Sequence, residues 1–172
     1  MNGSIQVYYG NGRGKTTAAL GLGIRAAGVG KQVIMVQFLK KKHSDTLDFL
    51  KKLEPELQIF RFEKAACGYS DLSPKEKQEQ MLNIKNALGY SRKVLDTGQC
   101  DLLILDEIFG LVDYNIITIE ELMDLIAVKK DSMDLILTGR NLPDEVREIA
   151  DCVYSIQREK EKTPEILAQG NF

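Results

Sequence analysis

A glycine-rich stretch between an apolar run and an Ala- and Leu-rich segment constrains this chain more than any other feature. The stretch is Gly10-Asn11-Gly12-Arg13-Gly14-Lys15-Thr16-Thr17. Residues 5–9 before it are apolar, and residues 16–27 after it have a helical composition. Glycines let the backbone curl so that successive N–H groups face phosphate oxygens, and a following helix N-terminus adds further N–H groups. This order of elements predicts a phosphate-binding loop between a strand and a helix.

Two side chains of the stretch have the chemistry that a bound phosphate requires. Lys15 is a compact cation for the phosphates, and the Thr16 hydroxyl is a ligand for Mg²⁺. The common pattern is GxxxxGK[ST], and counting back from Gly14 puts Tyr9 where its first glycine stands. The loop is therefore a variant, and we expect residues 10–17 to wrap the phosphates of a nucleotide. A glycine-rich turn that binds nothing is the alternative.

Five further apolar runs with helical patterns between them predict the rest of the fold. The runs cover residues 33–38, 57–62, 102–105, 135–137 and 152–156. Most are continuous rather than alternating, which is typical of strands buried on both faces of a parallel sheet. Helix starts are marked by capping boxes at Ser73 and Thr118 and by Asn141 with Pro143. We predict an α/β fold of the P-loop NTPase (RecA-like) type, a three-layer α/β/α arrangement around a mainly parallel sheet.

Length and composition fit one globular domain. The 172 residues predict a single nucleotide-binding domain over residues 1–172, in which the charged residues 158–172 form a tail or lid. The net charge of −2 predicts no broad basic surface for nucleic acid or anionic membrane. No apolar run approaches the roughly 18–20 residues of a membrane helix. The first residues lack the basic and apolar regions of a signal peptide, so we expect a cytoplasmic protein.

The cysteine and histidine content argues against disulfides and thiolate metal sites. Cys67, Cys100 and Cys152 are widely spaced and form no CxxC motif, so we expect reduced, partly buried packing residues. His43 is the only histidine and follows three lysines, which is typical of a solvated turn. A histidine-based metal site or a Ser-His-Asp triad therefore has little support.

Two acidic residues, Asp106 and Glu107, follow the apolar run at residues 102–105. Ligands of open α/β sheets collect at the carboxyl ends of the strands, and Mg²⁺ prefers carboxylate and water oxygens. We therefore expect Thr16, Asp106 and Glu107 on the metal side of the site. Asp106 would act directly or through water, and Glu107 would ligate the metal or polarise water. Which acid binds the metal directly stays open, as does a strand end with solvated acids.

Two further polar residues stand at predicted strand ends. Gln37 lies near the end of residues 33–38, and Arg140 follows residues 135–137 closely. We expect Arg140 at the same edge of the sheet as the acids, where a guanidinium can clamp phosphate or carboxylate. For each residue the alternative is a surface position without a role in the site.

These pieces together resemble the P-loop family of ATP:corrinoid adenosyltransferases. The resemblance is carried by Gly10-Asn11-Gly12-Arg13-Gly14-Lys15-Thr16-Thr17-Ala18-Ala19, Val36-Gln37-Phe38-Leu39-Lys40, Leu105-Asp106-Glu107 and Thr138-Gly139-Arg140. It covers roughly residues 5–156, and the deviation at Tyr9 is a feature of the family. The resemblance implies transfer of the 5′-deoxyadenosyl group of ATP to the cobalt of a corrinoid reduced to Co(I), with triphosphate released whole. No general base is implied, because the cobalt is the nucleophile and the protein positions the reactants.

The resemblance also implies residue roles. Lys15, Thr16 and Glu107 become catalytic, residues 10–17 with Arg140 bind ATP, and Gln37 and Tyr69 lie on the corrinoid side. The family typically presents a Gly-aromatic-Thr-Trp segment that shields the lower face of the corrin. The corresponding stretch here is Gly68-Tyr69-Ser70-Asp71. It keeps the aromatic residue, but Asp71 stands where tryptophan is expected, and the chain has no Trp.

The substrates implied by the resemblance are an ATP–Mg²⁺ complex and a reduced corrinoid, in adenosylcobalamin synthesis or salvage. A flavoprotein is the expected electron donor, and a homodimer is expected because family members often dimerise. Two other functions stay open. One is a P-loop ATPase or kinase that has lost corrinoid chemistry, in which Glu107 orients water and Arg140 contacts the γ-phosphate. The other is a nucleotide-binding or corrinoid-carrier module without catalytic activity.

Overall fold

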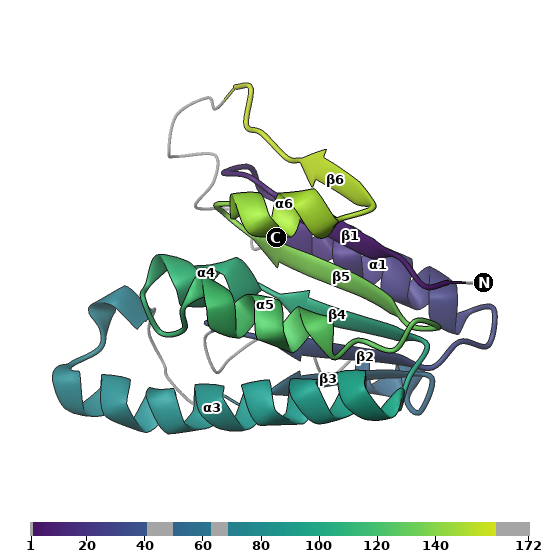
Figure 1. The fold of residues 1–172 in the computed structure, drawn as a ribbon, viewed down its shortest axis with the longest axis horizontal. Coiled ribbons are helices and arrows are strands. Elements are labelled where there is room, and N and C mark those ends of the chain that lie inside the picture. The colour runs from purple at the N-terminus through teal and green to yellow at the C-terminus, as the bar shows by residue number, and fades with distance from the viewer. Residues whose placement is uncertain (1, 41–49, 63–68, 161–172) are drawn as a thin grey trace.

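A six-stranded parallel sheet forms the centre of the protein (Figure 1). The computed structural model describes residues 2–40, 50–62 and 69–160. The strands are β1 (Ile5–Tyr9), β2 (Val33–Gln37), β3 (Leu57–Arg61), β4 (Leu102–Asp106), β5 (Asp134–Gly139) and β6 (Cys152–Ser155). They are arranged in the order β3-β2-β4-β5-β1-β6, and every neighbouring pair is parallel. The predicted α/β fold with a mainly parallel sheet is confirmed.

Helices cover both faces of the sheet, but unevenly. They are α1 (Lys15–Ala27), α3 (Pro74–Thr97), α4 (Ile108–Asp113), α5 (Ile119–Ala127) and α6 (Asp144–Ile149), with 3₁₀ turns η1 (Lys51–Leu53) and η2 (Tyr69–Asp71). The α1 helix packs on one face through Ala19, while α3 to α6 share a larger core on the other face (Figure 1). The three-layer prediction is therefore correct: among the described residues, α1 lies in one outer layer and α3 to α6 lie in the other.

The helix starts follow the sequence closely where capping residues mark them. The side chains of Ser73 and Thr118 accept hydrogen bonds from the backbone N–H groups of Glu76 and Glu121, which completes both capping boxes. The short helix α4 was not predicted. It starts directly after β4, because Glu107 adopts φ 63° and turns the chain between the two elements.

Burial follows the position of each strand in the sheet. All five residues of β2 and of β4 are buried, as expected for central strands. The prediction of burial on both faces is wrong for β6, which is mostly exposed because it is an edge strand. Cys152 on this strand is accordingly exposed rather than partly buried, whereas Cys100 is buried, and both are free thiols. Cys67 and His43 lie outside the described residues.

The predicted functional residues follow the carboxyl ends of neighbouring strands. The phosphate-binding loop follows β1, the acidic pair ends and follows β4, Gln37 ends β2 and Arg140 follows β5. These four strands run side by side in the sheet in the order β2-β4-β5-β1. Parallel strands place all of these ends at one edge. Within residues 2–40, 50–62 and 69–160, no helix is long and apolar enough to cross a membrane.

Candidate active site

The loop between β1 and α1 folds around the ammonium group of Lys15. The Lys15 ammonium donates hydrogen bonds to the carbonyl oxygens of Gly10 (2.7 Å) and Gly12 (2.9 Å). Gly14 adopts φ 109°, a left-handed conformation that favours glycine, and turns the chain into α1. The loop therefore has the curled shape that its sequence predicts, with the lysine held at its centre.

Gly10 and Gly12 serve a purpose that sequence reasoning missed. Their N–H groups donate to the carbonyl oxygens of Arg140 (3.0 Å) and Ile156 (2.9 Å). A Cβ at either position would lie 2.4 Å or 2.8 Å from the Ile156 carbonyl oxygen. These two glycines therefore allow the chain after β6 to approach the loop closely, and their N–H groups are already paired within the protein.

Charges of both signs surround Lys15. Burial lowers the pKa of its ammonium group most strongly, and the nearby cations Arg140 and Lys40 lower the pKa further. The carboxylates of Glu107 and Asp106 act in the opposite direction and raise it. Arg140 and both predicted acids are thus close enough to influence the lysine, although Arg140 itself is exposed. The structure brings these parts of the predicted site together.

Asp106 is the most enclosed charged group of the site, with a side chain that is 0% exposed. Thr16 Oγ1 donates to its carboxylate, at 2.9 Å from Oδ1 and 3.1 Å from Oδ2. Thr138 Oγ1 donates to Oδ1 (2.7 Å) and Gln37 Nε2 donates to Oδ2 (2.9 Å). The Lys40 ammonium forms an ion pair with Oδ2 at 3.4 Å. A buried carboxylate needs such partners, since burying an unpaired charge costs several kcal/mol.

Glu107 and Asp106 are linked through the Thr138 hydroxyl near the end of β5. The Glu107 N–H donates to Thr138 Oγ1 (2.8 Å), the same hydroxyl that donates to Asp106. This hydroxyl joins the two neighbouring acids at the edge of the sheet. Glu107 is half-buried, whereas Asp106 is buried, so the two predicted metal-side acids lie in different environments.

The oxygen atoms around Thr16 fit a magnesium–phosphate complex. A hydroxyl and a carboxylate within hydrogen-bond distance of each other are both hard ligands of the kind that Mg²⁺ takes. In the described part of the chain, no three His, Cys, Asp or Glu side chains are grouped to hold a metal ion. One or two carboxylates suit Mg²⁺ that arrives with phosphate and water oxygens, rather than a metal held by protein alone.

The predicted corrinoid-side residues occupy different places. Gln37 is 4% exposed, and its amide lies between Asp106 and Arg61, whose Nε donates to Gln37 Oε1 (2.7 Å). Tyr69 packs against Tyr114, which follows α4, with ring centroids 5.3 Å apart. Gly68 lies outside the described residues, and Asn11, Arg13 and Thr17 of the loop are exposed.

Three residues that were not predicted as site residues also contact the site, although Lys40 and Thr138 belong to segments that carry the family resemblance. Thr138, Lys40 and Arg61 each donate a hydrogen bond to a member of the Thr16–Asp106–Gln37 group. Polar residues near the ends of apolar runs were the available indication, since Arg61 is the last residue of β3 and Thr138 is the second-to-last residue of β5. Their importance depends on the strand order, which the sequence pattern does not reveal.

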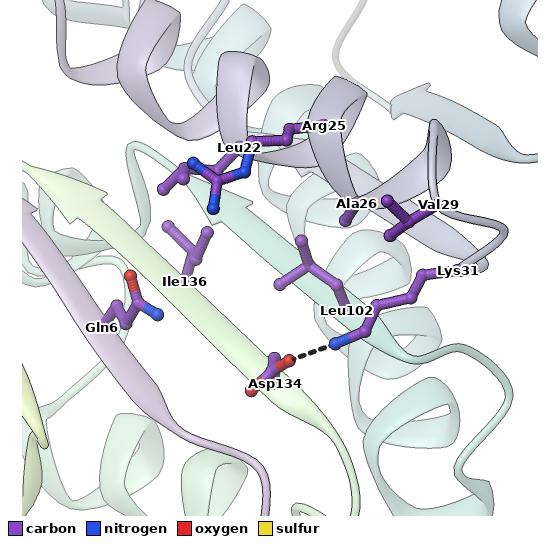
Figure 2. Close-up of a pocket in the computed structure, with 9 residues that line it drawn as sticks. All are labelled: Gln6, Leu22, Arg25, Ala26, Val29, Lys31, Leu102, Asp134 and Ile136. Carbon is purple, nitrogen blue, oxygen red and sulfur yellow. Dashed lines mark hydrogen bonds and ion pairs between the residues drawn. The ribbon is translucent and has the colours of Figure 1, made fainter.

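A cavity of about 330 Å³ lies on the α1 face, at the opposite end of the strands (Figure 2). Leu22, Arg25, Ala26 and Val29 line it from α1 and the turn after it, and Gln6, Lys31, Leu102, Asp134 and Ile136 complete its lining. Lys31 forms an ion pair with Asp134 (3.0 Å) at this cavity (Figure 2). It is separate from the phosphate-binding loop.

Comparison with known proteins decides between the nucleotide-binding classes that this geometry allows. The family model "ATP:corrinoid adenosyltransferase BtuR/CobO/CobP" matches residues 1–169. This chain belongs to that family. Its expected class is thereby confirmed, and it is a transferase that adenosylates corrinoids with ATP.

Individual relatives agree with the family model. A corrinoid adenosyltransferase of Escherichia coli (strain K12) is 30% identical over 155 residues, which are 90% of this chain and 76% of the relative. The corrinoid adenosyltransferase CobA of Salmonella typhimurium is also 30% identical over the same shares of the two chains. Among solved structures, a KaiC-like protein from Pyrococcus horikoshii OT3 has a TM-score of 0.61 at 19% identity, covering 94% of this chain and 75% of that one. This last likeness concerns the fold alone.

Proposed function

We propose that this adenosyltransferase holds the triphosphate of ATP in the loop at residues 10–17 and transfers the 5′-deoxyadenosyl group to the Co(I) centre of a corrinoid. The cobalt supplies the electron pair for the new Co–C5′ bond, the C5′–O bond breaks, and its electrons leave with triphosphate. The Thr16–Asp106 hydrogen bond beside Lys15 is the observation that supports this site most directly. It joins a phosphate-binding loop to the metal-side carboxylate of a neighbouring strand.

Lys15 stabilises the departing triphosphate. In the closed loop its ammonium satisfies two carbonyl oxygens, so an incoming phosphate replaces those contacts with stronger, charge-assisted ones. Burial strengthens electrostatic interactions, and charge develops on the leaving group in the transition state. Arg140, at the end of β5, supplies a second cation at the same side. The other N–H groups of the loop complete the phosphate site.

Thr16, Asp106 and Glu107 would hold the Mg²⁺ of the ATP complex from the protein side. When bound, it neutralises phosphate charge. Thr16 Oγ1 is placed to turn from Asp106 toward the metal, since Thr138, Gln37 and Lys40 still satisfy the carboxylate. Asp106 therefore acts as a fixed, enclosed anion, and the half-buried Glu107 is the more accessible of the two acids.

The remaining assignments extend this proposal. Tyr69 lies on the corrinoid side beside Tyr114, and Gln37 contributes from the end of β2. A flavoprotein reduces the corrinoid, the enzyme acts in the cytoplasm as a homodimer, and residues 1–172 form one domain with residues 158–172 as a tail or lid. The aromatic contact at Tyr69 supports a hydrophobic wall there, in spite of Asp71.

Mixing the protein with ATP, Mg²⁺ and a chemically reduced corrinoid tests the function. The expected product is an alkylcorrinoid that is sensitive to light. Its formation is measured by absorption spectroscopy, and the spectrum should revert when the sample is illuminated. Phosphate release without corrinoid, and no alkylated product with it, would instead support an ATPase or kinase. Binding of ATP without any turnover would support a carrier module.

A further inference from the structure

Arg61 lies at the carboxyl end of β3, in register with Gln37 of β2, which is in turn in register with Asp106 of β4. The three residues form a row across neighbouring strand ends. Arg61 Nε donates to Gln37 Oε1 (2.7 Å), and Gln37 Nε2 donates to Asp106 Oδ2 (2.9 Å). The guanidinium is therefore linked to the metal-side carboxylate through a single amide.

The amide has only one orientation that suits both neighbours. A guanidinium only donates hydrogen bonds, and an ionised carboxylate only accepts them. With Arg61 on its oxygen, Gln37 must direct its NH₂ group at Asp106. Rotation of the amide by half a turn would set oxygen against carboxylate and NH₂ against guanidinium. Gln37 is 4% exposed, so water has little access to compensate for such mismatched contacts.

The orientation of Gln37 in turn fixes the carboxylate. Thr138 holds Oδ1 and Gln37 holds Oδ2, so both oxygens have a donor apart from Thr16. Thr138 and Gln37 on the neighbouring strands thus keep the plane of the carboxylate fixed while the Thr16 hydroxyl turns from Asp106 toward the metal. Groups that hydrogen-bond to metal-side carboxylates orient them, and their loss typically lowers metal affinity about 10- to 100-fold.

The geometry points to Arg61 as a positioning residue: it locks the Gln37 amide so that Asp106 is held ready for the Mg²⁺–triphosphate complex. This inference rests on the proposed function, in which Asp106 is the metal-side carboxylate. Arg61 acts through Gln37 and not on the substrate. Its effect therefore depends on the presence of the amide, unlike that of a residue that only stabilises the fold.

Calorimetric titration of Mg²⁺ into the full chain with saturating ATP measures this role without corrinoid. Arg61→Met keeps an unbranched stem of about the length of the arginine stem and removes the guanidinium donors, and we expect it to raise the apparent Kd for Mg²⁺ about tenfold. Arg61→Lys keeps a cationic donor and should stay close to wild type. Arg25→Met, at the cavity on the far end of the strands (Figure 2), is the matched control and should change nothing.

A double-variant cycle separates positioning from a structural role. Gln37→Met should weaken Mg²⁺ binding as much as Arg61→Met does, and combining the two should add nothing further. An unchanged Mg²⁺ affinity in Arg61→Met, or fully additive losses in the double variant, would overturn the inference. Should Arg61→Met fail to fold, equal Mg²⁺ affinity of Gln37→Met and wild type would overturn it as well.

The outcome is distinguishable from a failure of the proposed function. A wild-type protein that binds Mg²⁺ with ATP but never alkylates a corrinoid contradicts the function and leaves the Arg61 test intact. If the enzyme is active but Arg61→Met binds Mg²⁺ as tightly as wild type does, only the inference about Arg61 is contradicted.

Discussion

Lys15 shows how much of this site is decided by single side chains. Its ammonium donates hydrogen bonds to two carbonyl oxygens of its own loop, so a phosphate in the proposed site would have to compete with the protein for it. The Lys-Thr pair and its loop were predictable, because their order after a strand and before a helix is specific. The hydrogen-bond partners of the Gly10 and Gly12 N–H groups were not predictable, because Arg140 and Ile156 follow strands that are far away in the sequence.

Removing the ammonium group should slow catalysis strongly. Lys15→Ala is expected to lower kcat for adenosyl transfer about 10²- to 10³-fold, the usual cost of losing one donor to a developing anion. Single-turnover absorption kinetics with pre-reduced corrinoid measure the rate. Lys31→Ala, on the distant cavity, is the control and should be near wild type. A Lys15→Ala enzyme with normal kcat would show that the leaving group lies elsewhere.

The two described cysteines should differ in reactivity. Burial raises the pKa of the Cys100 thiol to about 12, whereas Cys152 is exposed. Iodoacetamide attacks thiolates, so at about pH 8 the native protein should be labelled at Cys152 much faster than at Cys100. Peptide mass spectrometry over time measures both rates. Equal labelling of the two would contradict the burial of Cys100.

The same shift predicts how stability depends on pH. The pKa of Cys100 in the folded protein lies above the ordinary thiol value of 9.0, so the neutral thiol is favoured in the native state. Its contribution to the free energy of unfolding is fully present below pH 9.0 and is lost as the pH rises toward about 12. In Cys100→Ala this alkaline loss should be smaller, as measured by denaturant unfolding at several pH values.

At the scale of elements, α4 holds Glu107 in the site by packing directly on the end of β5. A Cβ on Gly139 would lie 2.4 Å from the Cβ of Phe109, so the glycine permits this contact. The capped helices were predictable because their first residues carry the capping pattern. The uncapped α4 was not, since its start depends on the left-handed conformation of Glu107 rather than on a sequence pattern.

Crowding this contact should destabilise the protein and disturb the site. Gly139→Ala is expected to lower the free energy of unfolding by about 1–3 kcal/mol, a typical cost of overpacking, and to reduce activity because α4 begins at Glu107. Gly89→Ala is the matched control, because nothing lies near its Cβ and alanine favours a helix. Urea unfolding compares the two variants. Equal stability of both would contradict the tight α4–β5 contact.

At the scale of the whole molecule, the parallel sheet gathers residues that are far apart in the sequence at one edge. Alternating apolar runs and helical patterns were sufficient to predict the layers and the placement of the candidate residues at one edge of the sheet. They do not encode the order β3-β2-β4, and so the row from Arg61 through Gln37 to Asp106 became visible only in the structure. The exposed β6 also follows from strand order, because edge strands lack a second neighbour.

Ligand binding should stabilise the whole fold. Mg²⁺ and ATP at about 100 times their Kd are expected to add about 2.7 kcal/mol to the stability, seen as a higher Tm. ATP with a chelator should raise the Tm less, because the contacts between Mg²⁺ and the protein are then missing. Identical shifts with and without Mg²⁺ would argue against a metal contact at Thr16 and Asp106.

In the proposed reaction, the bond between C5′ and the triphosphate oxygen breaks. ATP carrying ¹⁸O at the oxygen between C5′ and the α-phosphorus tests it directly, with reduced corrinoid and Mg²⁺. All of the label is expected to leave in triphosphate while the adenosyl group appears on cobalt. Label that stays bonded to C5′, in ADP released together with phosphate, would contradict it.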